Sequence, residues 1–303
     1  MRWRKLGRVF APTGGQPWML THAANPTALQ LDGELFRVYF SGRDAAQRSS
    51  VGFLDLDLRE PTRPLRVSER PVLSPGEAGL FDDSGASVAC AVRSGARVLL
   101  YYVGWNLGVT VPWRNSIGLA VSDDGGATFR KAARAPILDR SDADPYSLSY
   151  PWVLGPGAGG GGWQMWYGSN TAWGPKTDDL RHVIRRADST DGVAWRRDGG
   201  TALDLQPGEL GLARPCVLRE GGRYRMWHSY RGSHYRIGYA ESGDGRRWSR
   251  EDARAGIEPS QDGWDAEAVC YPCVFDCGAA RYMLYNGNGY GRSGFGIAIL
   301  ESD

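Results

Sequence analysis

The chain has 303 residues, with 36 basic and 34 acidic side chains and a net formal charge of +2. This balance, without basic runs, excludes the charge pattern of a duplex nucleic-acid binder or of a protein that attaches to an anionic membrane. No stretch approaches the roughly 18 consecutive apolar residues of a membrane-spanning helix. The 42 Gly, 17 Pro, 12 Trp and 14 Tyr favour turns and strands, so an all-β fold is predicted.

The N-terminal segment 1–10 carries charge but lacks the apolar core and the cleavage site of a secretory signal. The number of cysteines is odd, at five, which agrees with reduced thiols. We therefore expect a cytoplasmic protein. Its oligomeric state is left open by the sequence.

A segment led by an X-Pro pair recurs along the chain. The pairs start at Asn25, Tyr150, Arg214 and Tyr271, and in a second repeat Val88 stands at the matching place, with Ala89 where the others have Pro. Successive positions fall 63, 62, 64 and 57 residues apart. A fixed period of this kind indicates a repeat architecture, and the repeats are numbered one to five in chain order.

Each X-Pro segment is followed by a turn and by an aromatic strand, as at 38–41 and 165–168. Two such strands form a hairpin, and residues 155–162 form the looser hairpin turn of repeat three. A third strand follows each hairpin. In three repeats it runs into a Ser-x-Asp-Gly turn that precedes the aromatic start of an outer strand, the turns beginning at Ser122, Ser189 and Ser242.

The fifth repeat has no outer strand of its own, because the chain stops at Asp303. Residues 3–10 match the outer-strand sequence 129–137, so the first and last segments are predicted to pair in one sheet and close a ring. Five four-stranded repeats closed in this way predict a five-bladed β-propeller that forms a single domain over residues 1–303.

Acidic residues stand where the inner strands of three repeats begin. Asp83, Glu209 and Glu267 come from repeats two, four and five, and Asp82, Asp144 and Asp265 lie close by. Carboxylates converging on the mouth of a central channel are costly to leave unpaired unless they bind or catalyse. Asp83, Glu209 and Glu267 are therefore the catalytic candidates. The alternative is that acids at loop ends are solvated or cap turns.

The second strand of each repeat ends at the same rim, because it runs antiparallel to the inner strand. The residues at these ends are Arg43, Trp105, Asn170, Arg231 and Asn288. Arg and Asn suit sugar hydroxyls, carboxylates or phosphate, and Trp suits the C–H face of a sugar ring. The other predicted substrate contacts lie on or before inner strands and hairpins: His22, Asn25, Asp144, Tyr150, Arg214, His228, Asp265 and Tyr271.

The cysteines and histidines predict no metal site. Cys90, Cys216 and Cys273 occupy one equivalent inner-strand position, as small buried residues do. Cys270 and Cys273 form a single C-x-x-C pair without a second one, and the four histidines show no metal-binding spacing. No cofactor is expected.

With its X-Pro inner strands, the segments 226–229 and 237–242, and the turn from Asp244 to Trp248, the sequence resembles the five-bladed propeller glycosidases. This group comprises arabinanases, xylosidases, levansucrases and invertases, with the related mannoside phosphorylases. The resemblance implies that Asp83 orients substrate and that Glu209 is the general acid. Asn25 stands where the group has a first-blade Asp, and an amide can neither abstract a proton nor attack an anomeric carbon.

Three functions follow as hypotheses. The first is cleavage or transfer of a glycosidic bond with Glu209 as acid and Glu267 as base. The second is phosphorolysis, or transfer from a phosphate-bearing sugar, with Arg43, Arg214 and Arg231 holding the phosphate. The third is a propeller that binds sugar without catalysis. The expected partner is a small carbohydrate or sugar phosphate, without nucleic acid or membrane.

Overall fold

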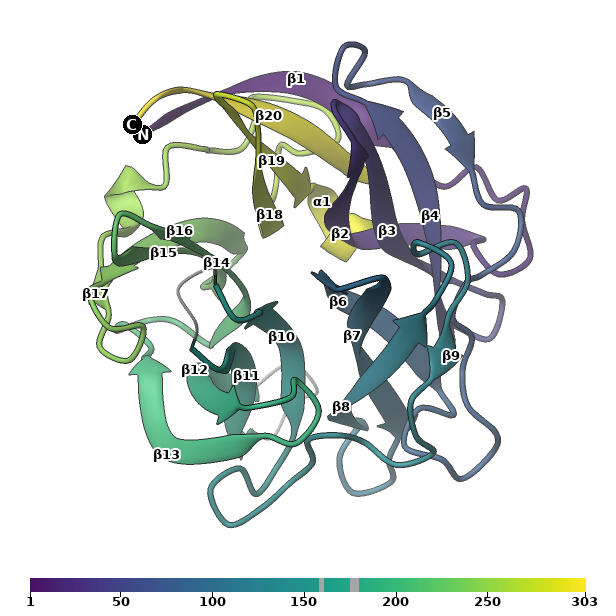
Figure 1. Cartoon of the computed structure of the whole chain (residues 1–303), viewed down its shortest axis with the longest axis vertical. Helices are drawn as coiled ribbons and strands as arrows, with labels where there is room; N and C mark the ends of the chain where they lie inside the picture. Colours follow the sequence, from purple (N-terminus) through teal and green to yellow (C-terminus); the bar gives the residue numbers. More distant parts are fainter. Residues whose placement is uncertain (158–160, 175–179) are drawn as a thin grey trace.

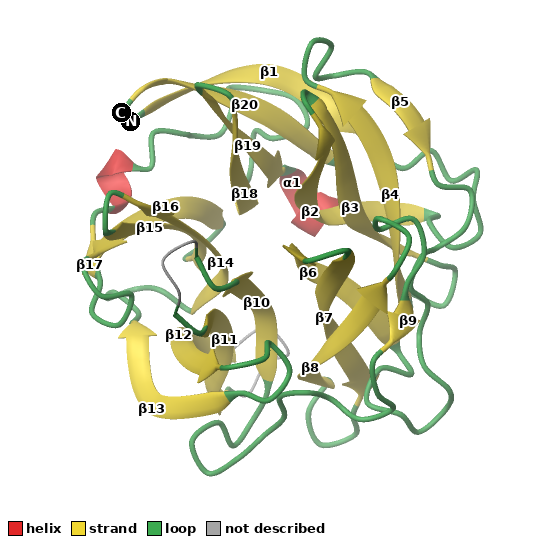
Figure 2. Ribbon diagram, viewed as in Figure 1, coloured by secondary structure: helices red, strands yellow, loops and turns green. Residues whose placement is uncertain are grey.

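The computed structural model describes residues 1–157, 161–174 and 180–303. Antiparallel strands surround a central axis, and the two chain ends lie side by side at the periphery (Figures 1 and 2). Helix in the described residues is limited to the short η1 (Asp252–Arg254) and α1 (Asn288–Gly291). No helix in this part of the chain is long and apolar enough to cross a membrane. The middle of the expected turn 155–162 lies outside the described residues.

The predicted strands are present in every repeat. In chain order the first three repeats comprise β2 (Thr21–Asp32), β3 (Leu35–Arg43), β4 (Ser49–Asp57) and β5 (Pro64–Val67); β6 (Gly85–Ser94), β7 (Arg97–Leu107), β8 (Trp113–Ser122) and β9 (Arg130–Lys131); and β10 (Leu148–Leu154), β11 (Trp163–Trp173), β12 (Leu180–Ser189) and β13 (Arg196–Leu203). The last two comprise β14 (Gly211–Glu220), β15 (Arg223–Arg231), β16 (Tyr235–Ser242) and β17 (Ser249–Arg250); and β18 (Cys270–Cys277), β19 (Ala280–Asn286) and β20 (Phe295–Ser302).

The first strand, β1 (Arg2–Phe10), pairs antiparallel with β20, the last one. Trp3 lies opposite Leu300 and Phe10 lies opposite Phe295, which confirms the predicted pairing of the chain ends. The resulting sheet has the order β1-β20-β19-β18. Single parallel bridges join repeat one to two and repeat three to four. Hydrogen bonding therefore groups these four repeats two by two and does not by itself define five separate sheets.

The Ser-x-Asp-Gly turns tie neighbouring repeats together. In each turn the Ser hydroxyl accepts the N–H of the third or fourth following residue, a Gly, at 2.8 to 2.9 Å. The carbonyl of that Gly accepts a hydrogen bond from an aromatic side chain of the preceding repeat. The pairs are Tyr39 with Gly126, Tyr101 with Gly192 and Trp166 with Gly245, at 2.7 to 2.8 Å. These aromatics therefore staple the repeats.

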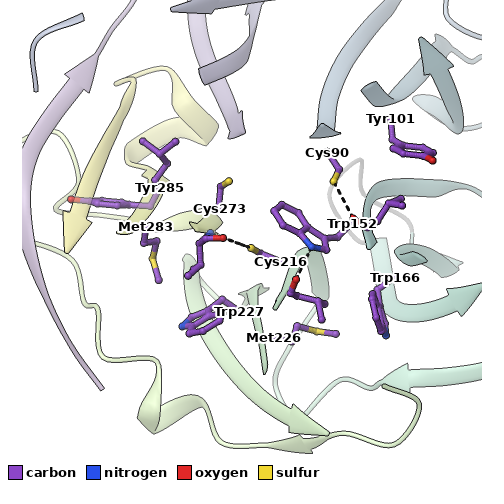
Figure 3. Packing of buried hydrophobic residues seen from close by; sticks show 14 of the residues in the cluster. Cys90, Tyr101, Trp152, Trp166, Cys216, Met226, Trp227, Cys273, Met283 and Tyr285 are labelled. Carbon is purple, nitrogen blue, oxygen red and sulfur yellow. Dashed lines mark hydrogen bonds between the residues drawn. The ribbon is translucent and has the colours of Figure 1, made fainter. Parts of the chain in front are cut away.

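The inner strands bulge at the X-Pro pairs. The residue before each Pro has a positive φ, between 29° and 58°, and the strand register shifts there. Next to these bulges, Cys90, Cys216 and Cys273 are buried among aromatic side chains (Figure 3). The Cys216 thiol contacts the Val274 carbonyl of the next inner strand at 3.6 Å. The cysteines are thus packing residues between inner strands.

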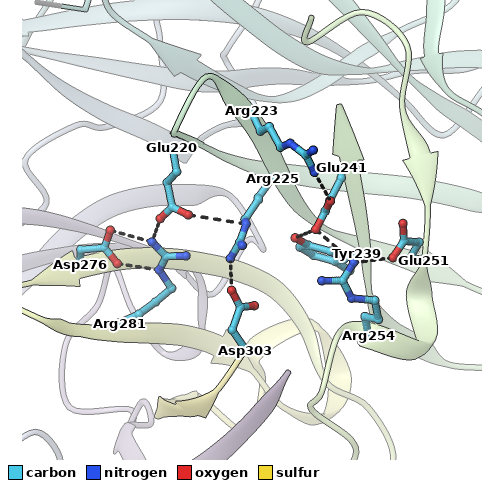
Figure 4. A network of polar contacts seen from close by, with 10 residues as sticks. All are labelled: Glu220, Arg223, Arg225, Tyr239, Glu241, Glu251, Arg254, Asp276, Arg281 and Asp303. Atoms are coloured by element: carbon cyan, nitrogen blue, oxygen red, sulfur yellow. Dashed lines mark hydrogen bonds and ion pairs between the residues drawn. The ribbon is translucent and has the colours of Figure 1, made fainter. Parts of the chain in front are cut away.

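A charged network joins repeats four and five at the end of the strands opposite the rim where the inner strands begin (Figure 4). Arg225 contacts Asp303 at 2.7 Å and Glu220 at 3.6 Å. Arg281 contacts Glu220 and is also 2.7 Å from Asp276. The network fixes the C-terminal end of the chain to the fourth repeat.

Candidate functional site at the channel mouth

The inner strands begin and the second strands end at one rim, as predicted. Thr21 lies opposite Arg43, Gly85 opposite Trp105, and Gly211 opposite Arg231. The same rim receives Asn170, whose N–H donates to the Ser147 carbonyl ahead of β10. Side chains from different repeats therefore surround one end of the central axis, and this end is the candidate site.

Three aspartates before inner strands are buried and already have protein partners. Asp144 is fully buried and accepts hydrogen bonds from Tyr167 and Ser169, and Arg197 lies 3.2 Å from it. Asp265, only 2% exposed, accepts bonds from Tyr285 and Lys5. Asp82 is bound in the same manner by Tyr102 and Lys131. Asp144 and Asp265, predicted as substrate contacts, are therefore internal ties between the inner and outer strands.

Glu209, the predicted general acid, forms the corresponding contact between an inner-strand residue and an outer strand in repeat four. Both of its oxygens contact the Arg250 guanidinium of β17, at 2.8 and 2.5 Å. Arg250 also lies 2.7 Å from Asp252, and His228 stands 3.5 Å from that same aspartate. The Glu209 side chain is thus turned toward the outer strand and held by a guanidinium. The role of Glu209 as general acid stays a prediction.

The two other predicted acids differ in their surroundings. Asp83 accepts hydrogen bonds from the Gly79 N–H, Ser84 and Asn106. Burial works in the opposite direction, but these bonds lower the pKa of Asp83, so it stays ionised. Glu267 has an exposed side chain, and within the described part of the chain only its backbone is engaged, with its N–H donating to Asn288 and its carbonyl accepting from Arg236. Glu267 is the predicted acid that is free to meet a ligand.

The five equivalent inner-strand positions carry no carboxylate. They are occupied by Asn25, Val88, Tyr150, Arg214 and Tyr271. Asn25 is 2% exposed, and its side-chain oxygen has no hydrogen-bond partner among the described residues. An unpaired buried amide oxygen is costly, so Asn25 is a candidate for contact with a donor group of a ligand or with water.

Arg214 links repeat four to repeats one and two. It is 1% exposed, and its guanidinium donates to the carbonyls of Asn25, Pro26 and Ala89 and to the Thr27 hydroxyl, at 2.6 to 3.1 Å. Burial lowers its pKa. The side chain is thus engaged by four oxygens of repeats one and two, and binding of substrate or phosphate by Arg214 stays a prediction.

Aromatic rings cover one side of the mouth. The Tyr271 ring lies 5.9 Å from the Tyr150 ring and 5.6 Å from the Tyr235 ring, and Tyr235 lies 5.5 Å from Tyr290. The Tyr271 N–H is held by the Ser229 hydroxyl at 2.7 Å, which fixes the left-handed backbone of Tyr271. Tyr290 is half exposed. The rings are inclined to one another by 33°, 58° and 82°, so they form an aromatic cluster of which Tyr290 is the exposed member.

Positive charge dominates the side of the mouth formed by repeat one. Burial, followed by the charges of Arg43 and Arg292, lowers the pKa of His22 to about 4. The Arg43 guanidinium lies 5.9 Å from the Trp105 ring. Among the residues that the structure describes, neither Arg43 nor Arg292 pairs with a carboxylate. Arg43 is placed near His22 by the pairing of β2 with β3, and Arg292 by the packing of α1 against β2.

The other predicted contacts are enclosed or already engaged. His228 is fully buried, and burial followed by the Arg250 charge lowers its pKa. Asn170 is 3% exposed. The Asn288 side chain accepts from the N–H groups of Glu267 and Ala268 and donates to Gly263, so it shapes the rim. His228 and Asn288 therefore act as structural residues. Burial, followed by the charge of Arg231, lowers the pKa of His182 to about 4.

Sequence reasoning missed Arg292 and the outer-strand cations. A repeated pattern could have revealed the cations, because an aromatic residue precedes each by two positions: Trp3 and Lys5, Phe129 and Lys131, Trp195 and Arg197, Trp248 and Arg250. Arg292 belongs to the irregular connection after α1 in repeat five. Within the described ranges no group of three or more His, Cys, Asp or Glu side chains could hold a metal ion.

Two proteins of Mycobacterium tuberculosis are 48% identical to the chain over 303 residues, covering all of both sequences. They are the uncharacterized proteins MT1551, from strain CDC 1551, and Rv1502, from strain H37Rv. The chain belongs to their family. No protein-family model matches it.

Solved structures show the fold. A structure of a BT0996 complex with RGII has a TM-score of 0.75 at 19% identity, covering 99% of this chain and 91% of that one. A thermostable family-43 glycoside hydrolase has a TM-score of 0.68 at 15% identity, covering 95% and 91%. A structure from a study of GH130 mannoside phosphorylases and hydrolases of β-1,2 mannosidic linkages gives 0.72 at 15%, covering 98% and 93%. The chain has the fold of propeller-type glycoside hydrolases, as its sequence indicated.

Proposed function

We propose that residues 1–303 form a single five-bladed β-propeller, with the blades corresponding to the five repeats, and that the protein is a carbohydrate-active enzyme. Four hydrogen-bonded strands in each repeat, the pairing of β1 with β20 and the fold shared with propeller glycoside hydrolases support this proposal. The substrate site is the channel mouth, where aromatic rings and polar side chains of several repeats meet.

The substrate carries phosphate or reacts with it. The observation that carries this proposal is that two arginines near His22 have no carboxylate partner among the described residues: Arg43, which lies opposite Thr21, and Arg292, which follows the α1 turn packed against β2. A cation pair left open in this way is stabilised by a bound anion. This favours phosphorolysis, or transfer from a sugar phosphate, over the two-carboxylate hydrolysis first expected.

Phosphate chemistry also suits the scarcity of free acids. In phosphorolysis a phosphate oxygen attacks the anomeric carbon, the bond to the leaving oxygen breaks, and that oxygen takes up a proton. The phosphate replaces the base, so one proton donor is sufficient. Glu267 is our candidate for that donor because its side chain is exposed at the rim. Asp83 stays ionised and holds Asn106, while Trp105, Tyr150 and Tyr271 pack against the sugar.

The test measures phosphate binding and phosphate-dependent turnover. Calorimetry with inorganic phosphate and with hexose 1-phosphates should give saturable binding that weakens about tenfold in Arg43→Gln and in Arg292→Gln, the scale of one charge-assisted bond. Arg63→Gln is the matched control, because its side chain is 81% exposed and pairs only loosely with Glu60 at 3.5 Å. Equal phosphate affinity in the wild type and in all three variants would refute the proposed anion site.

Hydrolysis is the second candidate, because solved structures with this fold include glycoside hydrolases. It predicts product formation from a panel of disaccharides without phosphate, and a loss of about 100-fold in rate for Glu267→Gln. Glu209→Gln should instead lower stability through the contact with Arg250. Saturable sugar binding with no product under either condition would leave the non-catalytic binding protein as the function.

A further inference from the structure

Apolar side chains extend beyond the rim on the hairpin between β7 and β8. Leu107 is 72% exposed and Val109 is fully exposed. The segment from Leu107 to Trp113 contains no charged residue. Single exposed apolar residues are ordinary, but two on a hairpin tip beside a candidate site indicate a contact surface.

The strand geometry places these side chains in a line that begins at the mouth. Trp105 and Leu107 are two residues apart on β7 and therefore share one face, whereas Asn106 points to the other face, toward Asp83. Leu107 lies directly opposite Trp113 on β8, so those two side chains are neighbours on that same face. The Trp113 ring lies 5.5 Å from the ring of Trp173.

The line, called the apolar strip, consists of Trp105, Leu107, Trp113 and Trp173. Its first member is the residue over which the Arg43 guanidinium lies, at 5.9 Å. The strip is therefore continuous with the cationic side of the mouth. A ligand that satisfied both surfaces would have an anionic or sugar head and an apolar chain several carbons long. An unsubstituted oligosaccharide would leave the strip uncovered.

We propose that the apolar strip binds the alkyl or prenyl chain of an amphipathic substrate, a lipid-linked sugar or sugar phosphate, while the mouth holds its head group. This proposal rests on the proposed function only in taking the mouth as the head-group site. The chain leaves the mouth over Trp105 and lies against Leu107 and Trp113, with Val109 at its far end. Burial of one such apolar side chain corresponds to roughly tenfold or more in affinity.

The experiment compares alkyl phosphates of increasing length, from ethyl to octyl, by calorimetry below their micelle concentrations. Octyl phosphate should bind at least about tenfold more tightly than ethyl phosphate. Leu107→Asp and Val109→Asp should abolish this gain and leave the affinity for inorganic phosphate unchanged. Leu65→Asp is the matched control, because Leu65 is 60% exposed on β5, away from the strip, and it should keep the gain.

Several results would overturn the proposal. An affinity that does not depend on chain length, or an equal loss of the gain in Leu65→Asp, would contradict it. Binding only to phosphatidylglycerol vesicles would identify the strip as a membrane-contact surface instead. Self-association of the protein that Val109→Asp abolishes would identify the strip as a contact with a second copy of the chain. Methyl and octyl glucosides separate the two proposals. If no phosphate binds, but octyl glucoside binds more tightly than methyl glucoside and Leu107→Asp abolishes the difference, the proposal for the apolar strip is supported and the proposal for the phosphate site is refuted.

Discussion

The tie between Lys5 and Asp265 tests whether the buried acids of this protein are structural. The Lys5 ammonium lies 2.6 Å from Asp265 and 3.0 Å from Ser260, and the Tyr285 hydroxyl donates to the same carboxylate oxygen at 3.1 Å. Lys5 belongs to β1, and Asp265 precedes β18. The contact therefore holds the N-terminal strand in the C-terminal repeat.

Replacing Lys5 with Met leaves a carboxylate of 3% side-chain exposure without its cation. Removing one partner of a buried ion pair costs about 3 to 5 kcal/mol. The Lys5 side chain is 24% exposed, so water reaches the vacated position and we expect a smaller loss, about 2 to 3 kcal/mol. Arg4→Met is the matched control on the same strand, because Arg4 is 56% exposed in its contact with Glu301 and should cost less than about 1 kcal/mol.

The assay is urea unfolding followed by tryptophan fluorescence, with the slope required to stay constant between variants. Asp265→Asn in the Lys5→Met background should recover part of the loss, with a coupling of at least about 1 kcal/mol. If Lys5→Met unfolds at the same urea concentration as Arg4→Met, the carboxylate does not depend on its cation. Asp265 would then return to the set of candidate site residues, and Asp144 with it.

Two further predictions concern the repeat staples and the mouth. Tyr101→Phe removes the donor to the Gly192 carbonyl and should lower the free energy of unfolding by about 1 to 2 kcal/mol, whereas Tyr146→Phe, at a 40% exposed ring, should have no effect; equal midpoints for both variants would contradict the staple. The pKa of His22 is lowered from 6.5 to about 4, so the unfolded chain binds a proton that the folded chain excludes, and the free energy of unfolding should fall as the pH drops from 6.5 toward 4. His22→Gln should flatten this part of the pH profile, and an unchanged slope would refute the assignment.

The sequence alone determined the repeat and its strands. The X-Pro period, the Ser-x-Asp-Gly turns and the likeness of residues 3–10 to an outer strand predicted each hairpin and the pairing of the chain ends, because turn chemistry and strand alternation are local properties. The burial of Cys90, Cys216 and Cys273 also followed from their equivalent positions. The sequence further located the rim at which Arg43, Trp105 and Arg231 end their strands.

Only the tertiary structure decided what the acids at that rim do. Asp144, Asp265 and Glu209 looked like free carboxylates because their partners, Arg197, Lys5 and Arg250, lie on outer strands far away in sequence. The same holds for Arg214, whose guanidinium donates to carbonyls of repeats one and two, more than 120 residues away in sequence. A charged side chain is neutralised by whatever the fold brings within a few ångströms of it, and local sequence patterns do not contain that information.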